Sequence, residues 1–409
     1  MKVLGIISEY NPFHKGHMYH LEESRKATSA DFVVSVMSGN FVQRGEPAMA
    51  DKWLRAKAAI ECGVDLVIEL PFVYACNSAE YFAYGGVSIL DGLGCVNYLS
   101  FGSESGDITE LLEIARLLVE EPEDLKKALK MNLDAGDSYA KAWEKALNAT
   151  YMKDASRILR GPNNILALEY LKILLKTYSN IEPITIPRIG NHHNSEEIGE
   201  EYSSATALRK KYYEQENLLG LEKYMPENSY RNFAGIKESV NIQMKDLFPV
   251  VTAEILKASR NELRNILSVS EGLENKIKNE IRNAVNMDEL IEKINSKRYA
   301  QTKIQRMLIH ILTNLDKDSM QHIMENRIVY ARILALNDNG AKLLKIIKKE
   351  RCAKIPIITN INKDLKDDSL EWNALNYDIL ATDLYNLSSG NNLYAGADYV
   401  RKPLKFQTF

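Results

Sequence analysis

Near its start the chain reads Val3-Leu-Gly-Ile-Ile-Ser-Glu-Tyr-Asn-Pro-Phe-His14-Lys15-Gly16-His17. The apolar run over residues 3–7 is bounded by turn-forming residues and predicts a buried parallel strand. Asn11-Pro12 ends that strand, because proline cannot continue a ladder of strand hydrogen bonds. From Gly16 onward the apolar spacing is helical. The sequence therefore predicts a first strand, a turn that carries two histidines, and a first helix.

This turn lies where an open α/β sheet binds its ligands. Backbone N–H groups at the start of a helix point out of the sheet and favour anions. The imidazoles of His14 and His17 and the ammonium of Lys15 suit a polyphosphate, and Gly16 lets the backbone approach it closely. Two histidines three apart in an arbitrary loop are more often surface residues. The strand before them and the helix after them favour the functional interpretation.

Length and composition limit the remaining possibilities. The 409 residues exceed one ordinary core and predict two or three domains. No apolar run reaches the ~20 residues of a membrane span, so we expect a cytoplasmic protein with no membrane partner. The net charge of -3 restricts any nucleic-acid surface to a local patch. The four cysteines lack metal-ligand spacing and are expected to be buried, reduced thiols.

Strand-like and helical segments alternate along the first part of the chain. After the first strand, further strands are expected at residues 31–37, 64–70, 96–101 and 181–188. This alternation predicts an α/β fold with a doubly wound parallel sheet and right-handed crossovers. From about residue 225 the periodicity is nearly all helical. We therefore expect an α/β domain over residues 1–222 and a mostly α-helical domain over residues 223–409.

The loop after the second expected strand carries Gln43 and Arg44, which would lie beside the histidine turn. They are candidates for the substrate side of the site, although an ordinary polar loop is the alternative. A basic residue here suits a small carboxylate, but spacing does not choose between Arg44 and the neighbouring Lys52 and Arg55. The sequence therefore predicts a substrate loop without naming the residue that holds the substrate.

Three further positions are candidate nucleotide contacts. Gly102 ends the fourth strand and would let a nucleotide lie flat on the backbone. Asn163 and Asn164 follow Pro162 at the start of a helix, where either one caps the helix or presents its amide to a ligand. Arg188 ends the fifth strand at the same edge of the sheet. His192 and His193 follow in a polar loop and are expected to be solvated or at the rim of the site, not metal ligands.

A second diagnostic stretch reads Ser203-Ser204-Ala-Thr206-Ala-Leu-Arg209. Serines before a helical run are N-cap residues, and their N–H and hydroxyl donors face outward. The pattern is common when it serves only as a cap. As a partner of the histidine turn, in this order along the chain, it is much more specific.

The two stretches resemble the HxGH and I-S-S-T-x-x-R motifs of the nucleotidylyltransferase superfamily, although an alanine here separates the second serine from the threonine. The resemblance implies a Rossmann-like domain in which His14, Lys15 and His17 are catalytic and stabilise charge as pyrophosphate leaves. It also implies that Ser204 and Arg209 bind the triphosphate. The ATP contacts expected from the motifs are Ile7, Ser8, Glu9, Tyr10, Asn11, Pro12, Phe13, His14, Gly16, His17, His20, Gly102, Asn163, Asn164, Arg188, Ser204 and Arg209.

Taken together, several segments look like the bacterial tRNA(Met) cytidine acetate ligase family: residues 3–17, 38–47, 65–71, 101–104, 162–166 and 297–299. The resemblance implies a two-step reaction in which acetate and ATP form acetyl-adenylate and pyrophosphate. The wobble cytidine of elongator tRNA(Met) then takes the acetyl group. ATP is the implied substrate and Mg²⁺ is expected with it, while no residue cluster marks a metal site. No protein partner is evident.

The helical part contains one stretch that fits an RNA contact. Residues 293–306 carry five basic residues and no acid. On the helix expected at residues 298–312, Tyr299, Lys303, Arg306 and His310 share a face, which is typical of a phosphate contact with an aromatic beside it. A solvated amphipathic helix is the commoner explanation of such a face. Given the family resemblance, Arg298, Lys303 and Arg306 are the candidate tRNA contacts.

Two other classes of function remain open. One is an adenylyltransferase that makes a dinucleotide-type cofactor, which fits both motifs but leaves the basic helical part unexplained. The other is a non-catalytic RNA-binding protein with a relic nucleotide fold. The presence of both histidines, the lysine and the arginine argues against the relic.

Overall fold

The computed structural model describes residues 1–137, 139–151, 155–189, 202–215, 217–234, 242–270, 272–296, 299–389 and 395–407. Its centre is one sheet with the strand order β5-β4-β1-β2-β3-β6-β7, and β8 also pairs with β6. The strands are β1 (Val3–Ser8), β2 (Phe32–Ser38), β3 (Leu66–Leu70), β4 (Tyr98–Ser103), β5 (Glu182–Pro187), β6 (Ala331–Leu336), β7 (Ile357–Ile358) and β8 (Leu404–Lys405). Strands β1 to β5 are parallel to one another in the order of a doubly wound sheet.

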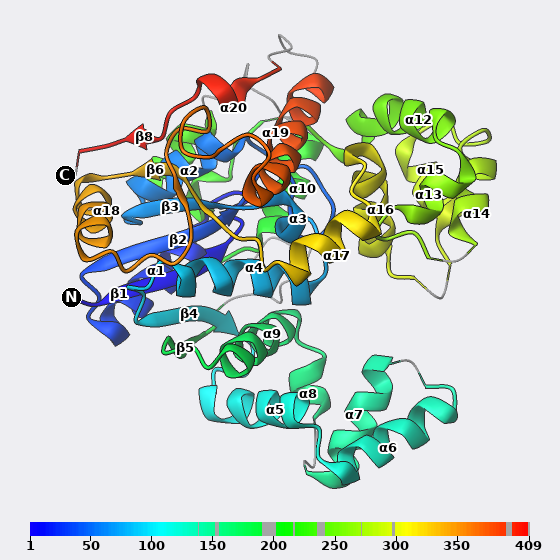
Figure 1. Ribbon diagram of the computed structural model, residues 1–409, viewed down its shortest axis with the longest axis horizontal. Coiled ribbons are helices and arrows are strands. Elements are labelled where there is room, and N and C mark those ends of the chain that lie inside the picture. Colours follow the sequence, from blue (N-terminus) through cyan, green and yellow to red (C-terminus); the bar gives the residue numbers. More distant parts are fainter. Residues whose placement is uncertain are drawn as a thin grey trace.

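Helices cover both faces of this sheet, and each face has its own apolar core (Figure 1). Side chains alternate along β1, so that Leu4 and Ile6 enter one core while Val3 enters the other. The first core is covered by α1 (Lys15–Thr28), α2 (Lys52–Glu61), α10 (Ala205–Gln215) and α11 (Glu227–Ala234). The second is covered by α3 (Phe72–Ala75), α4 (Ala79–Gly92), α9 (Pro162–Thr177), α18 (Asp338–Glu350) and α19 (Leu370–Ser388).

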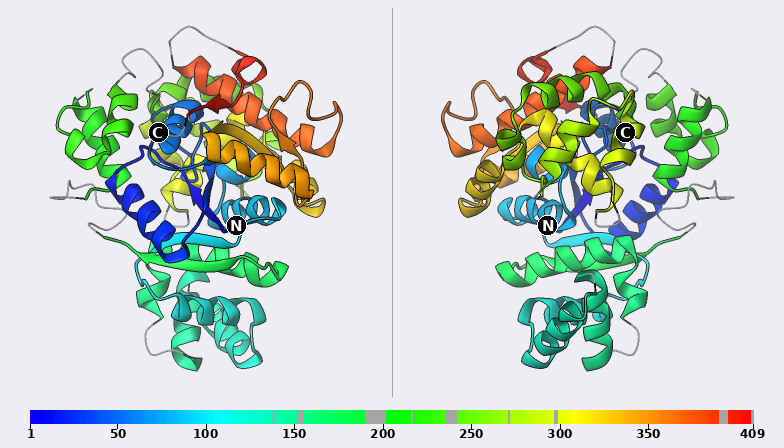
Figure 2. Two further views of the ribbon diagram at one scale, coloured as in Figure 1. Left: turned by 90° about the vertical axis from the view of Figure 1, so that its left-hand side faces the viewer. Right: turned by 90° about the vertical axis from the view of Figure 1, so that its right-hand side faces the viewer.

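Two groups of helices project from the sheet (Figures 1 and 2). The insert lobe lies between β4 and α9 and consists of α5 (Ile108–Glu120), α6 (Glu123–Asp134), α7 (Tyr139–Thr150) and α8 (Ser156–Leu159). The helical lobe consists of α12 (Phe248–Lys257), α13 (Arg260–Asn265), α14 (Leu273–Glu280), α15 (Met287–Ile294), α16 (Gln301–Thr313) and α17 (Lys317–Glu325). Short helices lie at Glu222–Tyr224, Met244–Leu247 and, as α20, Ala397–Val400. No helix in the described ranges combines the length and the apolar character that a membrane crossing needs.

The last part of the chain returns to the sheet, a feature that helical periodicity does not reveal. Strand β6 pairs with β3 in antiparallel register, so the sheet is mixed instead of wholly parallel. The hydroxyl of Tyr74 on α3, just after β3, donates to the carbonyl of Ile328 at 2.6 Å. This bond places Ile328, just before β6, close to Tyr74, just after β3. Strand β6 therefore begins beside the end of β3 and runs in the opposite direction. The division at residue 222 into an α/β domain and a mostly α-helical domain stays a prediction.

A buried ionic cluster fastens this returning segment. The ammonium of Lys52 on α2 lies 2.7 Å from Glu69 on β3 and 2.8 Å from Asp398 on α20. Arg332 on β6 pairs with the same two carboxylates, at 3.0 Å from Glu69. All four side chains are at most 5% exposed, and removing one partner of such a cluster typically costs about 3–5 kcal/mol because the others stay buried without it.

The expected RNA-binding face of α16 is partly buried. His310 is fully buried, donates through Nε2 to the Cys76 carbonyl at 2.7 Å and accepts from the Ser268 hydroxyl at Nδ1 (2.8 Å). The placement of His310 on an exposed face with Tyr299, Lys303 and Arg306 was therefore wrong. Helical spacing alone does not reveal that α16 packs against α19 and the residues after α3 on one side and against α12 and α15 on the other.

We expect His310 to make stability depend on pH in acid. Burial lowers the pKa of His310 from 6.5 to about 4, so the unfolded chain binds more protons between these pH values. The free energy of unfolding should therefore fall as the pH drops through this window, by on the order of a few kcal/mol. Urea unfolding at several pH values should give a smaller pH slope for His310→Gln than for the parent. Equal slopes would contradict a buried neutral imidazole.

Candidate nucleotide-binding site

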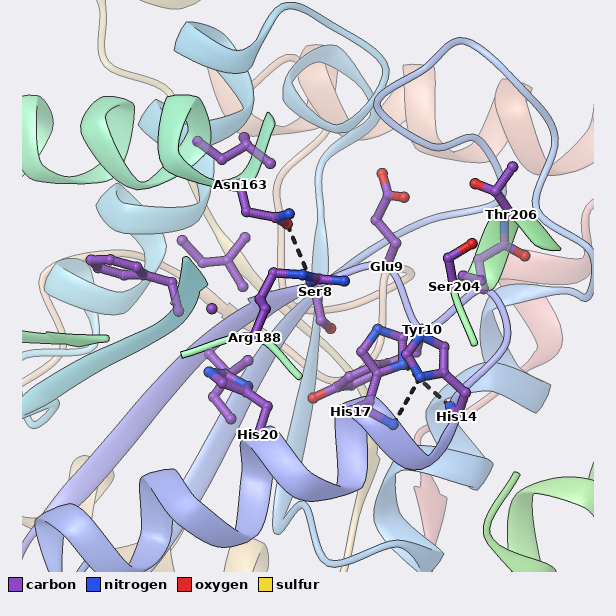
Figure 3. Close-up of a pocket in the computed structure, with 18 of the residues that line it drawn as sticks. Ser8, Glu9, Tyr10, His14, His17, His20, Asn163, Arg188, Ser204 and Thr206 are labelled. Atoms are coloured by element: carbon purple, nitrogen blue, oxygen red, sulfur yellow. Dashed lines mark hydrogen bonds between the residues drawn. The ribbon is translucent and has the colours of Figure 1, made fainter. Parts of the chain in front are cut away.

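A cavity of about 230 Å³ opens at the carboxyl ends of β1, β4 and β5 (Figure 3). The strand order reverses between β1 and β4, and in open α/β sheets the crevice at such a reversal is the usual ligand site. The turn between β1 and α1 forms its floor, and α10 and the loop between β2 and α2 form one wall. The opposite wall comes from β4, α9 and β5.

The two histidines form a reciprocal cap at the start of α1. The Nδ1 atom of His14 accepts the Gly16 N–H at 3.0 Å, and the Nδ1 atom of His17 accepts the His14 N–H at 3.3 Å. The two rings stack with centroids 3.8 Å apart. A Cβ on residue 16 would lie 2.9 Å from Cε1 of His14, so glycine is required for the ring to fold back. The spacing of this motif therefore follows from helix capping.

This cap determines where each imidazole carries its proton. Because both Nδ1 atoms accept backbone N–H groups, the neutral rings of His14 and His17 carry their protons on Nε2. Both rings line the cavity, as Figure 3 shows. In this tautomer each ring keeps an Nε2–H group that can donate to an anion.

The wall opposite α10 combines apolar side chains with one polar pair. Asn163 on α9 donates to Glu104 at 2.6 Å and accepts from Nη1 of Arg188 at 3.3 Å. Asn164 is fully buried and does not line the cavity, because its Oδ1 accepts the N–H groups of Glu104 and Ser105. The structure thus brings Asn163, and not Asn164, to the cavity. The apolar side chains of this wall are Phe82, Phe101, Leu166, Tyr170 and Ile186.

The N-terminus of α10 faces the histidines across the cavity. Ser204 caps this helix, since its hydroxyl oxygen accepts the Ala207 N–H at 3.0 Å. Arg209 donates to the carbonyl of Asn11 at 2.8 Å and so ties α10 to the histidine turn. The Ser203 hydroxyl and the Asn11 amide nitrogen are buried at the cavity and have no hydrogen-bond partner in the described structure. These two donors fit a bound anion that would satisfy them.

Ser203 and Thr206 were not among the expected contacts, and both line the cavity. Their only signal in the sequence was their place in the serine-rich cap. Tyr19 and Tyr202 also line it. Neither tyrosine belongs to a recognisable sequence motif, so their position at the cavity could not be predicted from the sequence.

The loop between β2 and α2 is held to the histidine turn by a buried guanidinium. Arg55 is fully buried and donates to the carbonyls of Glu9, Ser38, Gly39 and Ala50. With all these bonds made inside the protein, Arg55 is a positioning residue. The Gln43 N–H adds a bond to the Glu9 carboxylate at 2.8 Å. Lys52 is engaged in the ionic cluster, so Arg44 is the cation of this stretch that lines the cavity.

Helix α16 makes hydrogen bonds to the loop between β2 and α2. Arg306 donates to the Gln43 carbonyl at 3.1 Å, and Gln305 donates to Glu46 at 3.2 Å. Glu46 in turn lies 3.6 Å from Arg209. The expected tRNA contact Arg306 therefore touches the substrate loop. Lys303 donates to the Ser270 hydroxyl at 3.0 Å and lies over the Tyr299 ring.

Several titratable groups that line the cavity have shifted pKa values, and Glu9 and His20 are two of them. Burial raises the pKa of the Glu9 carboxyl, and the Gln43 N–H and the Arg209 guanidinium partly offset that effect. Burial lowers the pKa of His20 to about 4, and Arg188 adds to the shift. His20 is therefore neutral at pH 7, where its Nε2 lies 3.0 Å from the Ser100 hydroxyl.

Most of the expected site residues meet at this cavity. Lys15 is exposed on the first turn of α1 and does not line it. Pro12 and Phe13 are buried beneath the turn, where Phe13 packs on Tyr10. Arg298, His192 and His193 lie outside the described residues. The expected residues that do line the cavity are Ile7, Ser8, Glu9, Tyr10, Asn11, His14, Gly16, His17, His20, Gln43, Arg44, Gly102, Asn163, Arg188, Ser204 and Arg209.

Comparison with known proteins agrees with this arrangement. The family model described as HIGH Nucleotidyl Transferase matches residues 1–397, and the chain belongs to that family. It is 43% identical over 408 residues to the tRNA(Met) cytidine acetate ligase of Thermoanaerobacter sp. (strain X514), covering 99% of this chain and 100% of the relative. It is 45% identical over 417 residues to the protein of that name from Acetivibrio thermocellus, covering 98% and 99%. Within the family, the chain belongs with these ligases.

Solved structures give the same result. The crystal structure of Thermotoga maritima TmcAL in its apo form I has a TM-score of 0.93 and 32% identity, with 100% of both chains covered. The form of that protein bound with alpha-thio ATP has a TM-score of 0.91, also at 32% identity over both whole chains. The family expected from the motifs and the Rossmann-like nucleotidylyltransferase fold are thereby confirmed.

Gly45 tests the contact between the substrate loop and α16. It has a φ of +78°, and a Cβ there would overlap the backbone of Arg306. The left-handed backbone alone costs a non-glycine residue about 1–2 kcal/mol. We expect Gly45→Ala to lose more stability than that in thermal unfolding and to weaken ATP binding in calorimetry.

The matched control is Gly136→Ala. Gly136 has a φ of +87° and nothing within 4 Å of its Cβ position, so it reports the backbone strain alone. If both variants lower the melting temperature equally, close packing of the loop on α16 is not needed.

Proposed function

We propose that this protein uses ATP to activate acetate and then acetylates the wobble cytidine of elongator tRNA(Met) to N(4)-acetylcytidine. The observation that carries the proposal is the convergence of the histidine cap and the serine-rich cap on one cavity. The full-length similarity to proteins named tRNA(Met) cytidine acetate ligase supplies the substrate class. The structural relative bound with alpha-thio ATP supports ATP as the nucleotide.

In the proposed first step, an acetate oxygen attacks the α-phosphorus of ATP and the bond to the bridging oxygen of pyrophosphate breaks. Such a transfer needs in-line placement and stabilisation of the leaving charge, with little covalent help from the protein. The Nε2–H groups of His14 and His17 can stabilise the negative charge on the leaving pyrophosphate, together with Ser204 and Arg209. The apolar wall and the pair Asn163–Arg188 are suited to the adenosine end.

For an in-line attack, acetate must lie on the side of the α-phosphate opposite the leaving pyrophosphate, where a cation would hold its carboxylate. Of the cations in the substrate loop and at the start of α2, Lys52 and Arg55 do not line the cavity. Arg44 lines the cavity on the loop next to Glu9. We therefore assign the acetate carboxylate to Arg44, with Gln43 as its neighbour in the loop.

In the second step the exocyclic amine of the cytidine attacks the acetyl carbonyl, and AMP leaves with the electron pair of the broken anhydride bond. The amine proton passes to the AMP phosphate or to water. Anticodon bases are already partly unstacked, so presenting one to the cavity costs little. Lys303, Arg306 and Arg298 remain proposed contacts near the tRNA, and Arg306 would act through the substrate loop it touches.

We propose Mg²⁺ as a companion of ATP. The described residues contain no group of three or more His, Cys, Asp or Glu side chains suited to a metal. Mg²⁺ commonly keeps several waters and binds through substrate phosphates and one or two carboxylates. Glu9 is the carboxylate of the cavity that fits this role.

Exchange of labelled pyrophosphate into ATP tests the adenylation step. We expect acetate to stimulate the exchange, whereas a cofactor-building adenylyltransferase would require a mononucleotide instead. His17→Ala should reduce the exchange at least about 100-fold, because it removes one preorganised donor to the leaving charge. Its affinity for tRNA should stay within about twofold, since the imidazole lies in the nucleotide cavity.

His322→Ala is the control, because His322 is exposed on α17 and does not line the cavity. It should leave the exchange unchanged. Full exchange activity in His17→Ala would refute the proposed role of the histidine cap.

Arg44→Ala tests the acetate assignment. Loss of a charge-assisted hydrogen bond costs about 1.5–3 kcal/mol, so the KM for acetate should rise about 10- to 100-fold. The KM for ATP should change much less. A variant in which both constants rise together would mean that Arg44 serves the nucleotide instead.

A further inference from the structure

Lys303 and Arg306, the two cations expected to bind tRNA that the structure describes, are engaged within the protein. On α16, Lys303 is held by the Ser270 hydroxyl and the Tyr299 ring, and Arg306 is held by the Gln43 carbonyl. Burial lowers the pKa of Arg306 from its ordinary value, which agrees with a guanidinium withdrawn from water. The described part of α16 therefore offers only part of the charge that an RNA backbone needs, and other exposed cations must supply the rest.

A groove in the helical lobe has the missing charge. It holds about 330 Å³ between the end of α12, the start of α13 and the end of α14. Its lining residues, which define the lobe groove, are Ala258, Ser259, Arg260, Asn261, Lys278 and Arg282. Three of the six are cations and none is an acid.

Lys278 is fixed in the lobe groove by the end of α12. Its ammonium donates to the carbonyls of Ile255 at 2.6 Å and Leu256 at 3.1 Å, both in the last turn of that helix. The charge is thus placed before any ligand arrives, so little side-chain entropy remains to be lost on binding. A third N–H of the ammonium is left for a ligand.

Arg260 and Arg282 are exposed and form no ion pair with any carboxylate of the described chain. The neighbouring cations differ, since Lys257 pairs with Glu254 and Arg264 pairs with Glu274. The nearby Glu262 carboxylate accepts the Ser259 N–H at 2.6 Å and so caps α13. The three cations of the lobe groove are therefore available to a partner with negative charge.

We propose that the lobe groove binds the phosphodiester backbone of the RNA substrate, an inference that rests on the proposed function. Two guanidinium forks and one fixed ammonium match phosphate oxygens in geometry and charge. Figure 1 shows the helical lobe on the side of the sheet toward which β4 points, which is the side of the cavity. An RNA whose target base enters the cavity would pass along this lobe, and the contact would be independent of sequence.

The test is tRNA binding by the double variant Arg260→Ala/Arg282→Ala, measured by filter binding over a range of salt. Both side chains are exposed, so their removal leaves the fold intact, and Lys278 is kept because it fastens α12. We expect affinity to fall at least about tenfold near physiological salt. The slope of log K against log[salt] should shrink by about 0.7–0.9 for each phosphate that the variant no longer neutralises. Acetate-dependent pyrophosphate exchange without tRNA should equal that of the parent.

The matched control is Lys345→Ala/Lys348→Ala, which removes two exposed charges from α18 at the opposite end of the sheet (Figure 1). It should change neither affinity nor slope. The proposal would be overturned if Arg260→Ala/Arg282→Ala bound tRNA with the affinity and salt slope of the parent. It would also be overturned if this variant and the control lost the same affinity. Loss of acetate-dependent exchange in the parent would instead refute the proposed function, and a parent that does not bind tRNA would overturn both.

Discussion

The site depends on one constraint: two backbone N–H groups at the entry of α1 are bonded by imidazole nitrogens. Buried helix starts need acceptors, and serine or aspartate usually supplies them. Here His14 and His17 do so reciprocally, which orients both rings and puts both protons on Nε2. The same bonds that stabilise the helix therefore prepare two donors for an anion.

The turn that carries this cap is held by segments from distant parts of the chain. Arg55 joins the Glu9 carbonyl to the loop after β2, and Arg209 joins the Asn11 carbonyl to α10. Ser229 on α11 donates to the Phe13 carbonyl at 2.7 Å. Each bond satisfies a carbonyl that the turn leaves unpaired. A preorganised charge-binding site needs such support, because any movement of the donors would weaken their hold on the transition state.

The helical lobe and the sheet are linked through the same loop. Arg306 and Gln305 on α16 hold Gln43 and Glu46, and Gln43 holds Glu9 at the cavity. The ionic cluster of Lys52, Glu69, Arg332 and Asp398 anchors the base of α2 behind that loop. A chain of packed and charged contacts thus runs from the lobe that we assign to RNA to the end of β1. If the lobe binds RNA and the cavity binds ATP, as we propose, these contacts connect the two sites physically.

The sequence by itself determined the strands β1 to β5, the class of the fold and the two motifs, because apolar periodicity and helix-capping residues act locally. It also pointed to most of the residues that line the cavity. Tertiary structure alone decided that Asn163 and not Asn164 faces the cavity, that Lys15 is exposed outside it, and that β6 returns antiparallel to β3. It also decided that Lys303 and Arg306 of α16 are engaged inside the protein, while Arg260 and Arg282 of the lobe groove are exposed and form no ion pair within the described residues. These features depend on contacts between segments far apart in the chain, and such contacts cannot be predicted from a local pattern of residues.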